Sequence, residues 1–262
     1  MKILCANWQA EDDAALERRH YPGVEFMLQR TPPGSLMPVT TEALREADAI
    51  INYSATQFVG ADPAAFAKVR VAVRAGVGFD NLDLAGWGAK GVPVCNVPDY
   101  GTTEVADHAI ALMLALTRGT TAYAGALTAN GSAAWHFGHG QLVRRHRGTV
   151  FGVVGLGRIG LAAARRAAAF DMKVIFFDPH LLNGVDLSTG YERVHSLADL
   201  LRRADVVSIH APLNEETTGL INAAALADAK PRLISIPMIV MPAQGASRAS
   251  PLKAVSRVNE PR

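Results

Sequence analysis

The sequence contains only two cysteines in 262 residues, Cys5 and Cys95, and both lie in apolar runs that we interpret as strands. Their spacing fits neither a disulfide framework nor a metal site, so we expect buried free thiols in a reducing compartment. No apolar stretch approaches the roughly 20 residues of a membrane-spanning helix. The apolar run at residues 1–6 is too short for the core of a signal peptide. These absences predict a cytoplasmic protein that binds no membrane.

Neither sign of charge is in clear excess, since 26 Lys and Arg residues face 24 Asp and Glu residues. This balance argues against nucleic acid as a partner. A short basic run, Arg144, Arg145, His146 and Arg147, is interpreted as a solvated face near a domain junction. Hydrophobic residues make up 49% of a chain that is long enough for two domains. The composition therefore predicts a soluble, globular protein with two domains.

The first hundred residues alternate short apolar runs with helix-like segments. Such alternation predicts a parallel sheet with helices on its faces. Runs rich in Val and Ile are typical of strands that are buried on both sides. We place these strands at residues 2–6, 24–28, 49–52, 69–74 and 92–96.

A second series of the same kind begins at residue 149, with strands at 149–154, 173–177 and 205–210 and helices at 158–170 and 196–203. Ser196 and Asp199 have the spacing of a capping box at the start of the last helix. Between the two series, residues 102–118 have the broad apolar face of a long helix. Residues 119–148 show no clear periodicity. The fold class is therefore α/β, with two doubly wound parallel sheets.

A glycine-rich turn joins the first strand and first helix of the second series, with Gly155, Gly157 and Gly160 in the pattern G-x-G-x-x-G. The pattern alone is weak, but its position between an apolar strand and a helix is typical of dinucleotide-binding domains. The first glycine permits a tight turn, the second permits close approach of the pyrophosphate, and the third permits close packing of helix and strand. Arg158 and Ile159 then open the helix whose free N–H groups face the phosphates. A glycine-rich turn without a ligand is the alternative.

Asp178 ends the strand that follows this helix, at the spacing expected for the residue that binds the adenosine ribose. A carboxylate there accepts hydrogen bonds from the ribose hydroxyls of NAD and repels the 2′-phosphate of NADP. His180 lies close by and weakens this argument slightly. We therefore predict NAD as the cofactor.

Several ordered segments resemble the NAD-dependent D-isomer-specific 2-hydroxy-acid dehydrogenases, and within them the branch that includes the C-terminal-binding proteins. The resemblance covers most of the chain, from about Val69 to Lys230. It implies a flavodoxin-like substrate domain at residues 1–100 and a Rossmann NAD-binding domain at residues 101–231. The segments are residues 74–81 (RAGVGFDN), 94–98 (VCNVP), 105–108 (VADH), 155–160 (GLGRIG), 177–179 (FDP), 210–214 (HAPLN), Thr217 and 220–222 (LIN).

The resemblance also implies a substrate-binding loop. Gly76, Val77 and Gly78 match the segment whose backbone N–H groups receive the substrate carboxylate in that family. Glycines after a strand can expose such donors to an anion. An ordinary turn between a strand and a helix is the alternative.

Further cofactor-binding residues follow from the same resemblance. Val105 matches a residue that packs on the nicotinamide ring, although its helical spacing alone indicates a core position. His210, Ala211, Pro212 and Thr217 match the loop that lines the cofactor cleft. From its spacing alone, His210 is a strand-end histidine with its hydrogen bonds satisfied. A single His-x-x-His pair, His136 and His139, is a weak metal signal, and we predict no metal site.

The match to the family ends at Lys230 and Pro231. The family's catalytic Arg, Glu and His come after this point, and no residue here matches them, so no catalytic residue is assigned. Residues 233–236 still read as a strand, but Pro237 cannot donate to a central ladder. We interpret residues 232–262 as an aberrant tail of a truncated or frameshifted chain, which leaves the Rossmann domain incomplete.

The sequence thus predicts an NAD-dependent oxidoreductase that interconverts a small-molecule 2-hydroxy acid and 2-oxo acid, in a chain whose own activity is in doubt. The helix at residues 102–118 and the stretch up to residue 148 resemble the dimerisation region of the family, so a homodimer is expected. An NAD(H)-responsive protein-binding module, similar to a corepressor, and a defective product are the alternatives.

Overall fold

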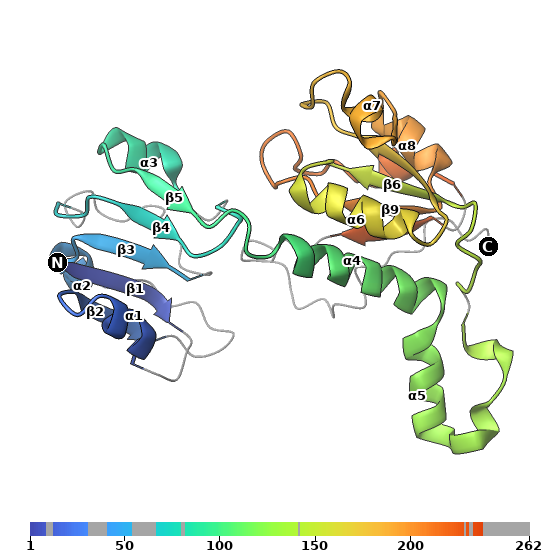
Figure 1. The fold of residues 1–262 in the computed structure, drawn as a ribbon, viewed down its shortest axis with the longest axis horizontal. Helices are drawn as coiled ribbons and strands as arrows, with labels where there is room; N and C mark the ends of the chain where they lie inside the picture. Colours follow the sequence, from blue (N-terminus) through green and yellow to red (C-terminus); the bar gives the residue numbers. More distant parts are fainter. Residues whose placement is uncertain are drawn as a thin grey trace. The chain divides into compact units, whose positions relative to one another are not determined.

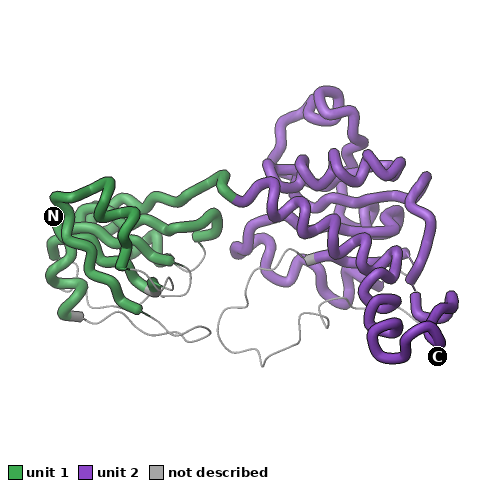
Figure 2. The backbone as a smooth tube through the Cα atoms, turned by 60° about the horizontal axis from the view of Figure 1, so that its bottom comes forward, with its two compact units in different colours: residues 1–100 green, residues 101–262 purple. Residues whose placement is uncertain are grey.

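The structure is a computed structural model that describes residues 1–8, 13–30, 41–53, 67–79, 82–140, 142–227, 229–230 and 233–237. The chain divides into two units, Met1–Tyr100 and Gly101–Arg262, coloured green and purple in Figure 2. Each unit has its own parallel sheet, its own helices and its own apolar cores. This arrangement confirms the predicted α/β fold class.

The described strands of unit 1 have the order β2-β1-β3-β4-β5, which is the 2-1-3-4-5 arrangement of flavodoxin-like folds. All pairs are parallel. The five predicted strands are therefore confirmed, four of them with shifted ends. The elements are β1 (Lys2–Trp8), α1 (Ala15–His20), β2 (Glu25–Arg30), α2 (Thr41–Glu46), β3 (Ala49–Asn52), β4 (Ala72–Arg74), α3 (Leu84–Ala89) and β5 (Val94–Asn96).

Both faces of the unit 1 sheet are buried. Successive side chains of a strand point to opposite faces, so Leu4 packs with Leu44 of α2 and Trp87 of α3, whereas Cys5 packs with Phe26 on the other face. Burial on both sides explains why these strands are apolar throughout and do not alternate with polar residues.

The two cysteines differ in environment. Cys5 is fully buried in β1, and burial raises the pKa of its thiol to about 11. Cys95 is exposed, because β5 lies at the edge of the described sheet. The prediction of two buried free thiols is therefore correct for Cys5 and wrong for the burial of Cys95. Cys5 lies on β1 and Cys95 on β5, and strands β3 and β4 lie between these two strands in the sheet.

Unit 2 has the strand order β10-β9-β6-β7-β8. Counted from β6 as the first strand, this is the 3-2-1-4-5 order of the Rossmann fold. The predicted strands are confirmed, and the predicted helix at 158–170 ends slightly earlier. The elements are α4 (Thr102–Thr117), α5 (Thr120–Asn130), the 3-10 turns η2 (Gly131–Ala134) and η3 (Phe137–His139), β6 (Val150–Val154), α6 (Arg158–Ala168), β7 (Lys173–Phe177), α7 (Val185–Thr189), β8 (Glu192–Arg193), α8 (Leu197–Arg203), β9 (Val206–Ile209), α9 (Ala223–Ala227) and β10 (Ile234–Pro237).

Helices cover both faces of the unit 2 sheet. Helices α4 and α6 lie side by side on one face, where they bury Phe151 and Phe176, and α8 covers the other face over Ile175 (Figure 1). Gly152 in β6 permits the close approach of α8, because a Cβ there would meet Cδ2 of Leu200 at 2.8 Å. The sheet is therefore doubly wound, and its strand ends are free to carry a site.

Helix α5 and the turns after it form an arm that projects from the body of unit 2 (Figure 1). The sequence predicted no regular structure over residues 119–148, and this prediction was wrong. Helix α5 buries none of its residues, so it has no one-sided apolar pattern that could have revealed it. Among the described residues no single helix is long and apolar enough to cross a membrane, although the bent pair Thr102–Thr117 and Thr120–Ala134 passes that test jointly.

The basic run that follows the arm lies within unit 2, not at the junction of the units. His146 of this run is half-buried and lies 2.6 Å from the buried hydroxyl of Thr117, measured from Nε2 to Oγ1. Burial, with Arg118 and Arg144 nearby, lowers the pKa of His146. The prediction that the basic run is a solvated face near a domain junction is therefore wrong for His146.

Two local predictions can be compared with the structure directly. Ser196 caps α8, since its side chain accepts a hydrogen bond from the Asp199 amide at 3.1 Å. The carboxylate of Asp199 instead pairs with Arg202 at 2.7 Å, a geometry that differs from a reciprocal capping box. Pro237 ends β10, which lies at the edge of the described sheet beside β9, where its missing N–H is tolerated.

Candidate dinucleotide site

The turn after β6 requires glycine at its first position. Gly155 has a φ of +85°, and its amide donates to the carbonyl of Phe177 at 2.9 Å. A Cβ on Gly155 would meet the amide nitrogen of Ala211 at 2.9 Å and the carbonyl carbon of His210 at 3.0 Å. The chain therefore passes between the ends of β7 and β9 at a point where no side chain fits.

The other two glycines serve different purposes. A Cβ on Gly160 would overlap the carbonyl oxygen of Gly155, so this glycine lets α6 pack against the turn. Gly157 is the N-cap of α6, and no atom lies within 4 Å of the position of a Cβ there. The first-turn N–H groups of α6, at the exposed Arg158 and the half-buried Ile159, have no acceptor within the helix. The turn thus leaves an open cradle for an anion at Gly157.

Asp178 fixes this turn to the end of β7. Its Oδ2 accepts a hydrogen bond from the Leu156 amide at 2.9 Å, and its Oδ1 accepts one from the His180 amide at 3.0 Å. A carboxylate has about four acceptor positions, so capacity for ribose hydroxyls remains. The residue has two roles, in shaping the turn and in presenting acceptors.

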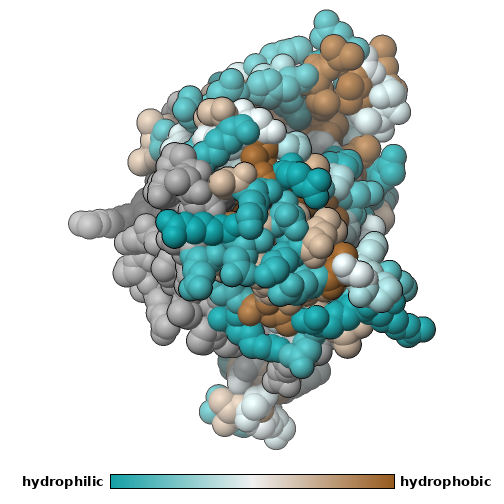
Figure 3. Space-filling view, turned by 90° about the vertical axis from the view of Figure 1, so that its left-hand side faces the viewer, coloured by the Kyte–Doolittle hydropathy of each residue, from teal (hydrophilic) through white to brown (hydrophobic). Residues whose placement is uncertain are grey.

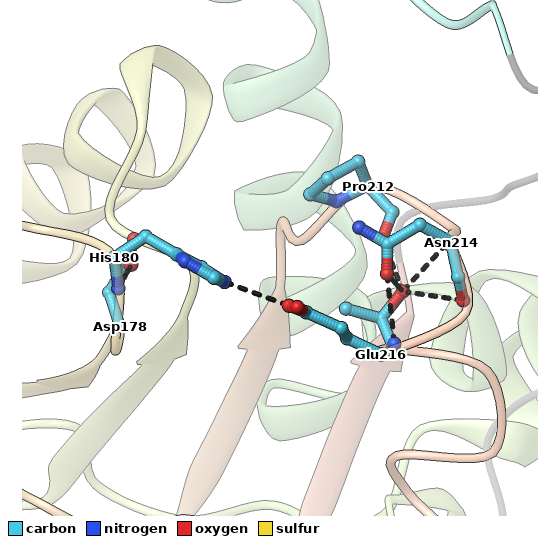
Figure 4. Close-up of polar contacts among 6 residues, drawn as sticks. Asp178, His180, Pro212, Asn214 and Glu216 are labelled. Atoms are coloured by element: carbon cyan, nitrogen blue, oxygen red, sulfur yellow. Dashed lines mark hydrogen bonds and ion pairs between the residues drawn. The ribbon is translucent and has the colours of Figure 1, made fainter.

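The loop after β9 is closed by Thr217. Its hydroxyl donates to the carbonyl of Pro212 at 2.5 Å and accepts from the amide of Asn214 at 2.9 Å, and its own amide donates to Oδ1 of Asn214 at 3.0 Å (Figure 4). The sequence predicted Thr217 as a cofactor-binding residue. In the structure its hydroxyl shapes the loop that carries Ala211 and Pro212.

An ion pair links this loop to the loop after β7. Nε2 of His180 lies 3.1 Å from Oε2 of Glu216, and Figure 4 shows the two side chains reaching toward each other from the two loops. The predicted cofactor residues did not include Glu216. No sequence signal could have revealed it, because the pairing depends on how two separate loops meet.

His210 continues the ladder beyond β9, since its amide donates to the carbonyl of Val154 at 2.8 Å. Its Nε2 lies 2.8 Å from Oγ of Ser208, whereas its buried Nδ1 has no hydrogen-bond partner among the described residues. Burial lowers the pKa of His210 to about 4. The prediction of a fully satisfied strand-end histidine is therefore only half correct.

The neutral, buried state of His210 makes the stability of the protein pH-dependent. The unfolded chain takes up a proton on this residue at about pH 6.5, whereas the folded chain does so only at about pH 4. Protons therefore favour unfolding in this window, and we expect a loss of about 3 kcal/mol of stability as the pH falls through it. Urea unfolding at pH 7 and pH 4.5 measures most of this loss.

The matched variant is His210→Gln, which lacks the titrating group. It should lose less stability than the wild type over the same pH interval, by most of the amount assigned to His210. Equal losses in both proteins would show that the imidazole does not carry this pH dependence.

Val105 is half-buried in the first turn of α4, where its amide donates to the carbonyl of Gly101 at 3.0 Å. Its side chain is thus only partly used in packing.

Three predicted groups lie at the carboxyl ends of the adjacent strands β6, β7 and β9: the glycine turn, Asp178 and the loop from His210 to Thr217. This is the edge at which open α/β sheets bind their ligands.

The predicted substrate loop belongs to unit 1. Asn96 of β5 donates from Nδ2 to the carbonyl of Val77 at 2.9 Å, and the amide of Val97 donates to the carbonyl of Gly76 at 3.1 Å. The amides of Val77 and Gly78 have no acceptor among the described residues. The loop is therefore held by its carbonyl groups, with N–H groups left to bind an anion.

Arg74 was overlooked as a candidate site residue. A Cβ on Gly76 would meet Nη1 of Arg74 at 2.6 Å, so the guanidinium packs directly on the glycine of the substrate loop. The resemblance predicted a carboxylate-binding arginine only beyond Pro231. Arg74 is the first residue of the segment 74–81, which also contains the substrate loop. Its position in that segment could have marked it as a candidate site residue.

The described residues contain no group of three or more His, Cys, Asp or Glu side chains that could hold a metal ion. The polar groups of the site in unit 2 are instead the backbone N–H groups at the start of α6 and the carboxylate of Asp178, at a strand edge of Rossmann type. Those features define a dinucleotide-binding domain.

Comparison with known proteins identifies the kind of domain. Residues 110–238 match the family described as D-isomer specific 2-hydroxyacid dehydrogenase, NAD binding domain. These residues are therefore similar to the NAD-binding domain of that family. Over 194 residues the chain is 40% identical to D-3-phosphoglycerate dehydrogenase of Mycobacterium bovis, which covers 74% of this chain. The chain spans 36% of the length of that relative.

Solved structures agree with this identification at the level of fold. D-lactate dehydrogenase from Aquifex aeolicus, complexed with NAD and lactic acid, has a TM-score of 0.78 and 24% identity over 90% of this chain and 68% of its own. The pyruvate reductase of Chlamydomonas reinhardtii has a TM-score of 0.70 and 27% identity with the same coverage. By their names these proteins are two dehydrogenases and a reductase, and the Aquifex aeolicus enzyme was solved with NAD bound.

Proposed function

We propose that this protein is an NAD-dependent oxidoreductase that acts on the CH–OH group of a small 2-hydroxy acid, or in reverse on the 2-oxo acid. The proposal rests on one observation: Gly157 leaves room for an anion at the start of α6, beside the carboxylate of Asp178, which accepts a hydrogen bond from the Leu156 amide. The names of the relatives support the substrate class.

The residues fit a nicotinamide dinucleotide. The first-turn N–H groups at Gly157, Arg158 and Ile159 would hold the pyrophosphate, and Asp178 would accept the adenosine ribose hydroxyls. Ala211 and Pro212 would line the same edge, and Val105 would present an apolar surface to the nicotinamide. When bound, the nicotinamide supplies or accepts the hydride.

Within unit 1, we assign the substrate carboxylate to the loop of Gly76, Val77 and Gly78. The support is the pair of N–H groups without acceptors and the guanidinium of Arg74 beside them. Charge-assisted hydrogen bonds of this kind are the stronger ones in proteins. Unit 1 would then be the substrate domain and residues 101–231 the NAD-binding domain.

We also propose that residues 1–262 bind NADH without reducing 2-oxo acids. The catalytic Arg, Glu and His expected by resemblance have no match after Pro231, and the sequence has no histidine after His210. A positioned general base typically contributes about a hundred- to ten-thousand-fold. Titration should therefore detect NADH binding, while NADH oxidation with glyoxylate, pyruvate, hydroxypyruvate and a bulkier 2-oxo acid stays at background.

The control is an intact relative, assayed under the same conditions with the same four substrates. Turnover by residues 1–262 comparable to that of the relative would mean that the tail supplies catalytic groups in an unexpected sequence. Absence of NADH binding would instead overturn the cofactor assignment.

The arm around α5 is proposed as the surface of a homodimer. Trp135 is 81% exposed and Phe137 is 98% exposed, and large exposed apolar side chains on one projecting element are typical of interfaces. We expect a dimer by light scattering at several concentrations. The double variant Trp135→Ala/Phe137→Ala should move it to the monomer of 27.8 kDa.

Leu182 and Leu187 offer a matched control, because they are also highly exposed but lie outside the arm. The double variant Leu182→Ala/Leu187→Ala should remain dimeric. A wild-type chain that stays monomeric at all concentrations would contradict the proposed dimer.

The alternative role, an NAD(H)-responsive protein-binding module of the C-terminal-binding-protein branch, requires an apolar groove on unit 1. On the face of unit 1 turned to the viewer in Figure 3, hydrophilic residues predominate and hydrophobic ones form small separate patches. No observation on that face favours a peptide groove, so the oxidoreductase is preferred.

A cytoplasmic location is also proposed. Its support is the pair of free thiols, Cys5 and Cys95, on strands that two other strands separate. Free thiols of this kind are typical of a reducing compartment.

A further inference from the structure

Two basic side chains, those of Arg193 and His180, lie near Asp178, and both are already engaged. Arg193 of β8 donates from Nη2 to the carbonyl of Leu181 at 2.7 Å and to that of Asp178 at 3.5 Å. Its guanidinium also lies 5.5 Å from the centre of the Phe176 ring. Arg193 is therefore held beneath the loop after β7.

His180 is the second basic side chain, and its backbone contacts the carboxylate of Asp178 directly. Its amide donates to Oδ1 of Asp178 at 3.0 Å, so its side chain starts two residues from the ribose-binding carboxylate. Glu216 binds its Nε2 at 3.1 Å from across the site (Figure 4). The pairing supplies a negative charge at the place where a 2′-phosphate would need a positive one.

Glu216 is well placed to maintain this pairing. It belongs to the turn that Thr217 and Asn214 close with two hydrogen bonds, one from each backbone amide to the other residue's side-chain oxygen. The side chains of His180 and Glu216 are 72% and 69% exposed. Since an exposed ion pair is weak, its importance lies in the position of its charges, not in stability.

We propose that Glu216 is a second specificity-determining residue for the cofactor, which disfavours NADPH by holding His180 and by adding its own charge near the adenosine ribose. This inference rests on the proposed assignment of Asp178 to that ribose. A phosphate is the ligand that a free imidazolium would accept in place of Glu216.

The test measures the dissociation constants of NADH and NADPH at pH 6.0 for the full chain and for three variants. Glu216→Gln should bind NADPH about three- to tenfold more tightly, because one charge-assisted contact is gained and one repulsion is lost. Its affinity for NADH should change less than about twofold. Glu216→Gln/His180→Ala should lose most of the gain for NADPH.

Glu215→Gln is the matched control, since it removes the same charge one residue away and Glu215 forms no ion pair among the described residues. It should leave the ratio of the two affinities nearly unchanged. A gain of affinity cannot arise from a damaged fold, so unfolding of a variant cannot imitate the expected result.

The inference is overturned if Glu216→Gln leaves NADPH binding unchanged, raises both affinities equally, or keeps its gain without His180. In each of these outcomes the wild type would still prefer NADH, and the proposed function would stand. A wild-type chain that bound neither dinucleotide would overturn the proposed function itself, and this inference with it.

Discussion

Gly157→Ala should weaken NADH binding by roughly ten- to a hundredfold while the protein stays folded. Apart from Gly157 and its two chain neighbours, no atom of the described residues lies within 4 Å of the position of the new methyl group. The backbone there is extended, with a φ of −71° and a ψ of −163°, so alanine needs no left-handed conformation. Alanine is a poorer N-cap than glycine, so a loss of stability of up to about 1 kcal/mol is expected.

The loss of binding has a separate cause. A methyl group at Gly157 would stand where the pyrophosphate must approach the first N–H groups of α6. Fluorescence titration of NADH and urea unfolding on the same preparation measure the two effects. A Gly157→Ala protein that bound NADH as well as the wild type would show that the open cradle is not the phosphate site.

Gly155→Ala is the informative counterpart, because the same added methyl group acts on the fold. It would force alanine to a φ of +85° and against the backbone of His210 and Ala211. Backbone strain and overpacking together should cost about 2–5 kcal/mol of stability. If both variants lost stability equally, the distinction between a structural and a ligand-facing glycine would fail.

Asp178→Ala should weaken NADH binding by roughly ten- to a hundredfold, since hydrogen bonds to a charged group each contribute about 1.5–3 kcal/mol. NADPH binding should fall less, because the same change removes a repulsion from the 2′-phosphate. The preference for NADH over NADPH is therefore expected to shrink. Calorimetric titration with both dinucleotides measures it.

Asp178 also anchors the glycine turn through the amide of Leu156, at 2.9 Å. Asp178→Asn separates the two roles, because Oδ1 of an asparagine can still accept from that amide while the negative charge is gone. Because an asparagine has a single acceptor oxygen, it cannot also accept from the His180 amide, so the variant should lose about 1 kcal/mol of stability and still lose selectivity. Unchanged selectivity in both variants would remove Asp178 from the ribose site.

Much of the fold was predictable because it depends on local patterns. Buried parallel strands are apolar throughout, and the runs at β3 and β7 have the predicted bounds. The arm of α5 was not predictable, since an exposed helix has no apolar stripe. The exposure of Cys95 was missed for a related reason: the position of β5 at the sheet edge depends on strand order, not on its own residues.

The candidate site likewise has features that the sequence predicted and features that it did not. The glycine motif and the residue that ends the next strand were evident from spacing, because the chemistry of a pyrophosphate and a ribose requires them at a fixed distance along the chain. The separate purposes of the three glycines were also predicted from the motif, but the atoms that surround each glycine were not. The different surroundings of Gly155 and Gly157 are set by the backbone of His210 and Ala211, more than fifty residues away.

By itself the sequence determined the two α/β units, the dinucleotide motif and the carboxylate of Asp178, since each of these follows from residues that are close neighbours in the chain. Only the tertiary structure decided that Nδ1 of His210 is buried without a partner and that Glu216 meets His180. It also decided that Arg74 packs on the substrate loop. The physical reason is that burial and charge pairing depend on which strand ends and loops the fold brings together, and those contacts have no fixed spacing in the sequence.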